Sequence, residues 1–280
     1  MALSRVITTV PIFFNDNNMI DYDTMGDHIN HIINAGITQI VILDTPEAHV
    51  LTQIERLEYA QYVYNNFHNY VQIIVGLNYM NSDVNLLSPY ANYLMVNVPT
   101  QAYYLQEGLY QYLITLFNTI NLPIILSCGE NLAPATIQRL TYNDLVANNL
   151  VGIKDTSDNL FHFMKIIEMS PNLKVFTSND NFVIPFMSVG GDGVISMASN
   201  VIPEQMLQLV NYSLQGMTND AQNTFAIIRP IINSITDCVS LKYVLSRERN
   251  NIMISNVRLP FIQLTEEVQN QYNNMNVEIV

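Results

Sequence analysis

The chain has 280 residues, a length that suits one large domain or two small ones and allows a sizeable core to be buried. Hydrophobic residues make up 49% of the chain and charged residues 12%, which indicates a folded chain and excludes a disordered one. The formal net charge of -13 would repel a phosphate backbone, so no nucleic-acid partner is expected.

The sequence shows no sign of export, of a membrane span or of a metal site. The opening "MALSRVITTVPIFF" lacks the features of a signal peptide, and no run approaches the ~18 apolar residues of a membrane span. Cys128 and Cys238 lie far apart and outside any metal-binding spacing. His28 and His31 could form a ligand pair, but no third ligand accompanies them, and a solvent-facing helix is favoured. We therefore expect a cytoplasmic protein without a metal.

Eight short β-branched runs follow one another along the chain, as in "ITQIVIL" and "LPIIL". Continuous apolar runs are typical of strands buried on both faces of a parallel sheet. Amphipathic segments separate them, and one begins with Thr52 and Glu55 at the spacing of a capping box. The runs lie at 5–10, 37–43, 71–75, 93–98, 123–127, 150–154, 173–177 and 192–196. This alternation predicts an α/β fold, a (β/α)8 TIM barrel.

Beyond residue 200 only helical patterns remain, at 203–216, 219–236, 238–249 and 260–278, with Pro230 and Pro260 as interruptions. We expect the barrel to occupy residues 1–218. A helical extension packed on the barrel would then occupy residues 219–280.

The stretch "LVGIKDTSDNL", residues 150–160, places a lysine at the end of the sixth strand. Barrels of this kind carry their chemistry at the C-terminal ends of the strands. An amine in an apolar barrel is desolvated, which favours the neutral form that attacks a carbonyl to give an imine. Lys154 therefore indicates a class I aldolase or lyase. The structural alternative is a lysine that pairs with Asp155 or Asp158 at the strand end.

Several stretches occur in the order found in one known family. In chain order these stretches are "LQEGLYQYL", "GIKDTSDNL", "SND", "GGDGVISMASNVIPE" and "VRLPFIQLTEE". With them, nearly the whole chain resembles the dihydrodipicolinate synthase and N-acetylneuraminate lyase family of pyruvate-dependent class I aldolases. The resemblance implies that Lys154 forms the imine, that Asn179 replaces a glycine after strand seven, and that the backbone near Ile195 lines the pocket. It also implies pyruvate and an aldehyde as substrates, no cofactor, and a homo-oligomer, either tetramer or dimer.

The end of the second strand departs from this family. Its pattern G-[TS]-T-G-E binds the carboxylate of the keto acid, whereas this chain reads "LDTPE" at residues 43–47. Thr45 matches, but Asp44 takes the place of a hydroxyl and Pro46 removes an N–H. An ionised Asp44 would oppose a substrate carboxylate unless it is protonated, turned away or paired.

The proton-transfer residues depart as well. Ser127 occupies the position of the family's relay tyrosine, and Thr100 and Gln101 occupy the positions of its paired tyrosines. Tyr103 and Tyr104 follow closely, so either could form a substitute relay with Thr45 and Ser127. The arginine that contacts a second carboxylate in the synthase branch is missing. This favours cleavage of a sugar-like 2-keto acid, as in the 2-keto-3-deoxygluconate aldolase branch.

Two functions remain open from the sequence. One is a Schiff-base carbon–carbon lyase or synthase, and the other is a catalytically degenerate barrel that binds a metabolite or a protein. Asp44 and Ser127 favour the second, whereas Lys154 and Thr45 favour the first. We prefer the enzyme because a buried, unpaired lysine is costly to keep without a purpose. His49 could face the site, although a loop histidine is the simpler interpretation.

Overall fold

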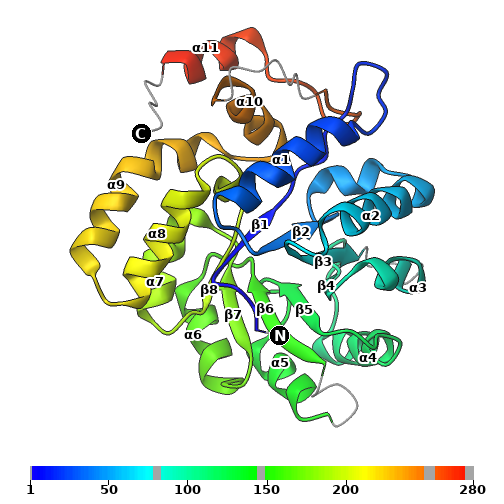
Figure 1. Cartoon of the computed structure of the whole chain (residues 1–280). Coiled ribbons are helices and arrows are strands. Elements are labelled where there is room, and N and C mark those ends of the chain that lie inside the picture. The colour runs from blue at the N-terminus through cyan, green and yellow to red at the C-terminus, as the bar shows by residue number, and fades with distance from the viewer. Residues whose placement is uncertain (1, 78–82, 144–148, 249–255, 275–280) are drawn as a thin grey trace.

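The structure is a computed structural model that describes residues 2–77, 83–143, 149–248 and 256–274. Eight parallel strands follow one another around a closed barrel in chain order, as Figure 1 shows. The strands are β1 (Val6–Thr9), β2 (Gln39–Ile42), β3 (Gln72–Leu77), β4 (Tyr93–Asn97), β5 (Ile124–Cys128), β6 (Leu150–Asp155), β7 (Lys174–Thr177) and β8 (Gly193–Ser196). Each of them overlaps one of the eight predicted runs, and β3, β5 and β6 extend one or two residues beyond theirs. The predicted (β/α)8 barrel is confirmed.

Helices connect the strands around the outside of the barrel. The helix that follows β2 begins at the predicted capping box, in which Thr52 Oγ1 accepts the Glu55 N–H at 3.2 Å and Glu55 Oε2 accepts the Thr52 N–H at 2.9 Å. The connecting helices are α1 (Tyr22–Asn34), α2 (Gln53–Phe67), α3 (Val84–Leu87), α4 (Gln106–Phe117), α5 (Pro134–Thr141), α6 (Leu160–Met169), α7 (Val183–Ser188) and α8 (Pro203–Leu214).

Apolar side chains fill both sides of the strand layer. One set points into the barrel and forms an inner cluster of Ile7, Val41, Ile74, Tyr93, Met95, Ile125, Phe176 and Ile195. The alternate set faces the helices and joins the larger core, which includes Ile40, Ile42, Ile73 and Val75. Because the barrel interior is packed with side chains, an open site is left only at the strand ends.

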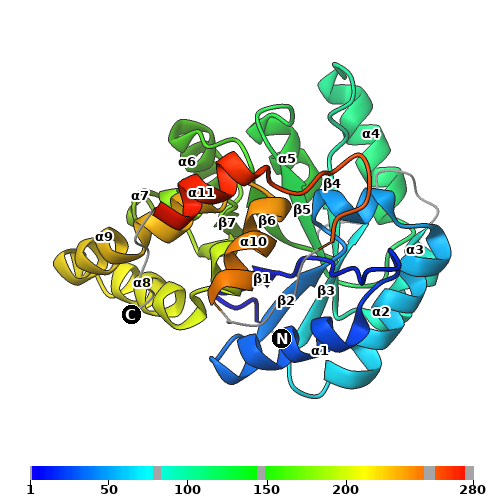
Figure 2. The ribbon, with the colours of Figure 1, turned by 90° about the horizontal axis from the view of Figure 1, so that it is seen from above.

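Three further helices follow the barrel, namely α9 (Thr218–Ser234), α10 (Cys238–Glu248) and α11 (Glu266–Asn274). Figure 2 shows α10 and α11 across one end of the barrel. Pro230 does not interrupt α9, because the buried Ile228, Ile231 and Ile232 hold its last turns against the core. The last helix begins at Glu266, later than the predicted 260, and positions 275–278 of that prediction lie outside the described residues.

An ion pair without solvent exposure joins the extension to the loop after β2. Lys242 on α10 binds Glu47, both side chains are 0% exposed, and Lys242 Nζ also donates to the Asn256 carbonyl at 3.2 Å. Arg258 binds Glu55 on α2 at 2.6 Å. These contacts pack the extension on the barrel, while the division at residue 218 stays a prediction.

The expectation of a solvent-facing helix was wrong for His28. Its side chain is buried, Nε2 lies 2.8 Å from Asn200 Oδ1, and Phe13 packs edge-on against the ring. The reason is that His28 shares the buried face of α1 with Met25, Ile29 and Ile32. In the described part of the chain, no group of three or more His, Cys, Asp or Glu residues could hold a metal ion. In the same part, no helix combines the length and apolarity that a membrane crossing requires.

Candidate active site

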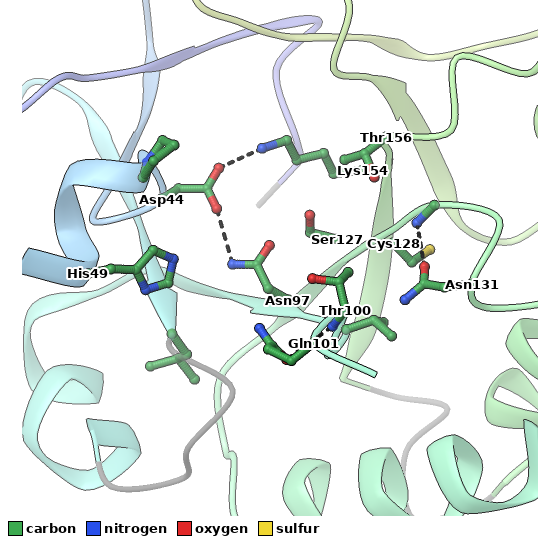
Figure 3. Close-up of a pocket in the computed structure, with 14 residues that line it drawn as sticks. Asp44, His49, Asn97, Thr100, Gln101, Ser127, Cys128, Asn131, Lys154 and Thr156 are labelled. Atoms are coloured by element: carbon green, nitrogen blue, oxygen red, sulfur yellow. Dashed lines mark hydrogen bonds and ion pairs between the residues drawn. The ribbon is translucent and has the colours of Figure 1, made fainter. Parts of the chain in front are cut away.

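A pocket of about 270 Å³ opens at the C-terminal ends of the strands (Figure 3). Asn97 ends β4, Ser127 lies in β5 and Lys154 in β6, and the strand register pairs Asn97 with Ser127 and Ser127 with Lys154. These three side chains therefore stand at one level around the mouth. The lining residues are Asp44, Pro46, His49, Leu77, Asn97, Val98, Thr100, Gln101, Ser127, Cys128, Gly129, Asn131, Lys154 and Thr156.

Lys154 forms an ion pair with Asp44 across the barrel mouth. Lys154 Nζ lies 2.6 Å from Asp44 Oδ2, and Asn97 Nδ2 donates to Asp44 Oδ1 at 3.2 Å, as Figure 3 shows. The side chains of Lys154 and Asp44 are 14% and 2% exposed. The sequence predicted either an unpaired amine or a pair with Asp155 or Asp158. The partner is instead Asp44, because the turn after β2 aims it across the mouth.

The backbone before Asp44 adopts an unusual conformation. Leu43 has a φ of +59°, in the left-handed region that bulky side chains rarely adopt. Gly76 in β3 allows this turn to approach closely, because a Cβ at position 76 would lie 2.6 Å from the Leu43 carbonyl oxygen. The carboxylate of Asp44 therefore reaches the pocket through a strained turn that only a glycine in β3 accommodates.

Half of the predicted site residues line the pocket. These are Asp44, Thr100, Gln101, Ser127 and Lys154. The pocket lining does not include Thr45, Tyr103, Tyr104, Asn179 or Ile195. The catalytic and binding roles given to all ten residues stay predictions.

The five residues outside the lining have other surroundings. Thr45 is buried and precedes the short helix η1 (Pro46–Val50), and its hydroxyl has no partner among the described residues. Tyr103 and Tyr104, before α4, are 93% and 39% exposed. Asn179 accepts the Asn181 N–H at 3.0 Å, and the side chain of Ile195 belongs to the inner cluster of the barrel.

Sequence reasoning missed Asn97 and Asn131. Asn97 is the last residue of β4, so its position at a strand end was the signal that could have found it. Asn131 accepts the Gly129 N–H at 3.1 Å and donates to the Pro99 carbonyl at 3.2 Å, which joins the loops after β5 and β4. His49, which the sequence left as a loop residue, lines the pocket in Figure 3.

Two further titratable groups, Cys128 in the pocket lining and His162 outside it, change the chemistry of the pocket little. Burial, followed by the charge of Asp155, raises the pKa of the Cys128 thiol far above its ordinary value, so the thiol stays protonated. His162 Nδ1 lies 3.3 Å from Asp155 Oδ2 and Nε2 lies 3.2 Å from the Leu132 carbonyl. Burial opposes a charge on His162, but the hydrogen bond and charge of Asp155, together with the Leu132 carbonyl and the charge of Glu130, outweigh burial and raise the pKa of His162. His162 therefore links the end of β6 and the first turn of α6 to the loop after β5.

The fold and the pocket define a (β/α)8 barrel with a lysine at the end of its sixth strand. Residues 2–278 match the model of the dihydrodipicolinate synthetase family, and the chain belongs to that family. It is 27% identical to the 4-hydroxy-tetrahydrodipicolinate synthase of Oceanobacillus iheyensis, over 95% of this chain and 94% of that protein. It is 31% identical to the enzyme of the same name from Chlorobium phaeobacteroides, over 95% of this chain and 93% of that protein. The predicted resemblance is confirmed.

Solved structures agree on the fold. The dihydrodipicolinate synthase of Aquifex aeolicus matches with a TM-score of 0.89 at 20% identity, over 97% of this chain and 96% of that chain. The dihydrodipicolinate synthase of Thermotoga maritima matches with a TM-score of 0.88 at 22% identity, over 97% of each chain. At these identities the likeness supports the architecture alone.

Proposed function

We propose that this protein is a class I, lysine Schiff-base carbon–carbon lyase or synthase that acts on pyruvate or another 2-keto acid and an aldehyde. The observation that carries this proposal is Lys154, whose amine stands beside a pocket at the reactive end of the barrel. The amine would condense with the carbonyl, and the protonated imine would draw electrons from the neighbouring carbon. Ser127, Thr100 and Gln101 supply neutral hydrogen-bonding groups for the substrate.

We propose a sugar-like 2-keto acid as the longer substrate. Among the described residues that line the pocket, none is an arginine. Apart from Asp44, His49, Cys128 and Lys154, the polar side chains there carry amides or hydroxyls. Amides and hydroxyls suit the hydroxyl groups of a sugar chain better than a second carboxylate. The named relatives are synthases, so both directions of the carbon–carbon step belong in the assay.

Borohydride trapping tests the proposal. The protein is incubated with pyruvate and sodium borohydride, and its mass and the modified peptide are determined. We expect a stable adduct on Lys154 that is absent from Lys154→Ala and retained by Lys165→Ala, because Lys165 lies on the exposed face of α6 and is 61% exposed. A wild-type protein that forms no adduct with pyruvate, with other keto acids or with aldehydes would contradict the proposal.

We do not favour the second function, a degenerate barrel that only binds a metabolite or a protein. The reason is that the lysine and an adjoining pocket remain together despite the departures at Asp44 and Ser127. We also propose a homo-oligomer in the cytoplasm, as the resemblance implies and as the two unpaired, buried cysteines suit. Light scattering on the purified protein would measure the oligomeric state.

A further inference from the structure

The carboxylate of Asp44 has both of its oxygens engaged, and one partner is the reacting amine. Oδ2 lies 2.6 Å from Lys154 Nζ, and Oδ1 accepts the Asn97 amide at 3.2 Å. Asn97 belongs to the strand next to β5, so a rigid element orients the carboxylate. An ion pair stabilises the protonated lysine, and a protonated amine cannot attack a carbonyl. Imine formation therefore needs a group that removes a proton from this nitrogen.

The fold accepts backbone strain to place Asp44 there. Leu43 holds a φ of +59°, and Gly76 leaves room for its carbonyl. Backbone strain of this kind is unfavourable and is found mainly where the surroundings hold a functional group in place. A carboxylate with no function beside the amine would not need this turn.

The other candidates for proton transfer are placed less well. Tyr103 is 93% exposed and lies outside the pocket lining, and Cys128 keeps its thiol proton. Ser127 offers a hydroxyl, which is a weak base. His49 lines the pocket and is the remaining titratable group there, so it requires a control of its own.

We infer that Asp44 is the acid–base residue of imine formation and takes over the role of the missing tyrosine. This inference rests on the proposed function. Asp44 first accepts a proton from the Lys154 ammonium, and the neutral amine then adds to the substrate carbonyl. One N–H proton of this adduct passes to the former carbonyl oxygen, which gives the carbinolamine. The protonated Asp44 then donates its proton to the carbinolamine hydroxyl, which leaves as water.

The proton balance of the two steps closes. An ammonium and a ketone become an iminium and water, and Asp44 returns to its ionised form without an external acid or base. The anion left beside the iminium neutralises it, and no metal or oxidant takes part. Asn97 acts as a positioning residue, because its amide donates a hydrogen bond to the Asp44 carboxylate and takes no part in the proton transfers.

The rate of adduct formation tests the inference. Wild type, Asp44→Asn and Asp44→Glu are mixed with pyruvate and borohydride, quenched at intervals and analysed by mass. Removal of a general acid–base group slows a step by about 10²-fold or more, which we expect for Asp44→Asn, and Asp44→Glu should recover part of the rate. Asp220→Asn on α9 is the matched control, since Asp220 is exposed and lies outside the pocket lining.

A pH profile separates catalysis from a structural role. In Asp44→Asn the carboxylate no longer accepts the lysine proton and solvent must do so, so the trapping rate should rise more steeply with pH than in wild type. A circular dichroism melt on each variant checks that it is folded, and if Asp44→Asn does not fold, Asp44→Glu carries the same rate and pH measurements.

The outcomes distinguish this inference from the proposed function. If the wild type forms no adduct, both fail. If the wild type forms the adduct and Asp44→Asn traps pyruvate equally fast or faster, Asp44 merely opposes the substrate carboxylate and the inference alone is overturned. It is also overturned if His49→Asn, and not Asp44→Asn, loses the rate.

Discussion

Two lysine–carboxylate pairs share one loop of this protein and differ in what surrounds them. Asp44 and Glu47 are three residues apart after β2, and each binds a lysine from a distant part of the chain. The Lys242–Glu47 pair is 0% exposed on both sides, and Lys242 also contacts the Asn256 carbonyl and the Phe14 ring. The Lys154–Asp44 pair borders a pocket of about 270 Å³.

The difference shows which pair can do chemistry. Burial raises the pKa of Glu47 and lowers that of Lys242, and their mutual attraction offsets only part of each shift. No substrate can reach that pair, so its role is to hold α10 against the barrel. Lys154 has the same kind of partner but adjoins open space, which a carbonyl compound can enter.

The largest expected effect is the loss of stability when Glu47 is neutralised, compared with the loss when Asp44 is neutralised. Glu47→Gln leaves a fully buried ammonium without a counter-charge and should lower the free energy of unfolding by about 3–5 kcal/mol. Asp44→Asn makes the same change beside a pocket from which water can reach the lysine, so its cost should be smaller, about 1–3 kcal/mol. Guanidinium denaturation of both variants measures this, and equal losses would break the comparison.

A smaller effect is expected at the close approach behind Asp44. In Gly76→Ala the new Cβ would overlap the Leu43 carbonyl, so the turn must shift, at a cost of about 1–3 kcal/mol. The same shift should slow adduct formation about tenfold or more, because it moves the carboxylate away from Lys154. Gly108→Ala on α4 is the matched control, since nothing lies within 4 Å of its Cβ position. An unchanged trapping rate in Gly76→Ala would show that the turn does not position Asp44.

The smallest expected effect concerns the pair of His162 with Asp155, the residue that follows Lys154 in the sequence. The folded protein raises the pKa of His162 above its ordinary value of about 6.5, so the ion pair stabilises the fold fully below that pH. The contribution is lost as the pH rises through the raised pKa. Between pH 6 and 8 the free energy of unfolding of the wild type should fall by less than about 1 kcal/mol because of this pair, and we expect that fall to be absent in His162→Asn. Urea denaturation across that range measures it, and an unchanged pH slope would contradict the assignment.

The barrel could be predicted from sequence because its strands carry a local signal. Runs such as "LPIIL" are apolar throughout, and a strand buried on both faces requires this wherever it pairs. Pro230 shows the limit of that reasoning, because tertiary packing of Ile231 and Ile232 keeps α9 intact across a residue that disfavours a helix.

The site could be predicted only in part. Lys154 was found from its place at a strand end, but its partner Asp44 lies 110 residues away, and their contact depends on a left-handed turn at Leu43. Asn97 was missed because its position at a strand end was its one signal, and no motif around it added a second. Side-chain direction across a barrel mouth is a property of the closed sheet, which no local window contains.

The buried link between Glu47 and Lys242 has a consequence for how the protein is made. The loop that carries Asp44 is translated early, whereas the cation that neutralises Glu47 is added 195 residues later. Until α10 has left the ribosome and docked, the carboxylate of Glu47 lacks its counter-ion and cannot be buried at low cost. In a nascent or shortened chain without α10, the loop that carries Asp44 and Glu47 at the C-terminal ends of the strands would therefore not be held in place.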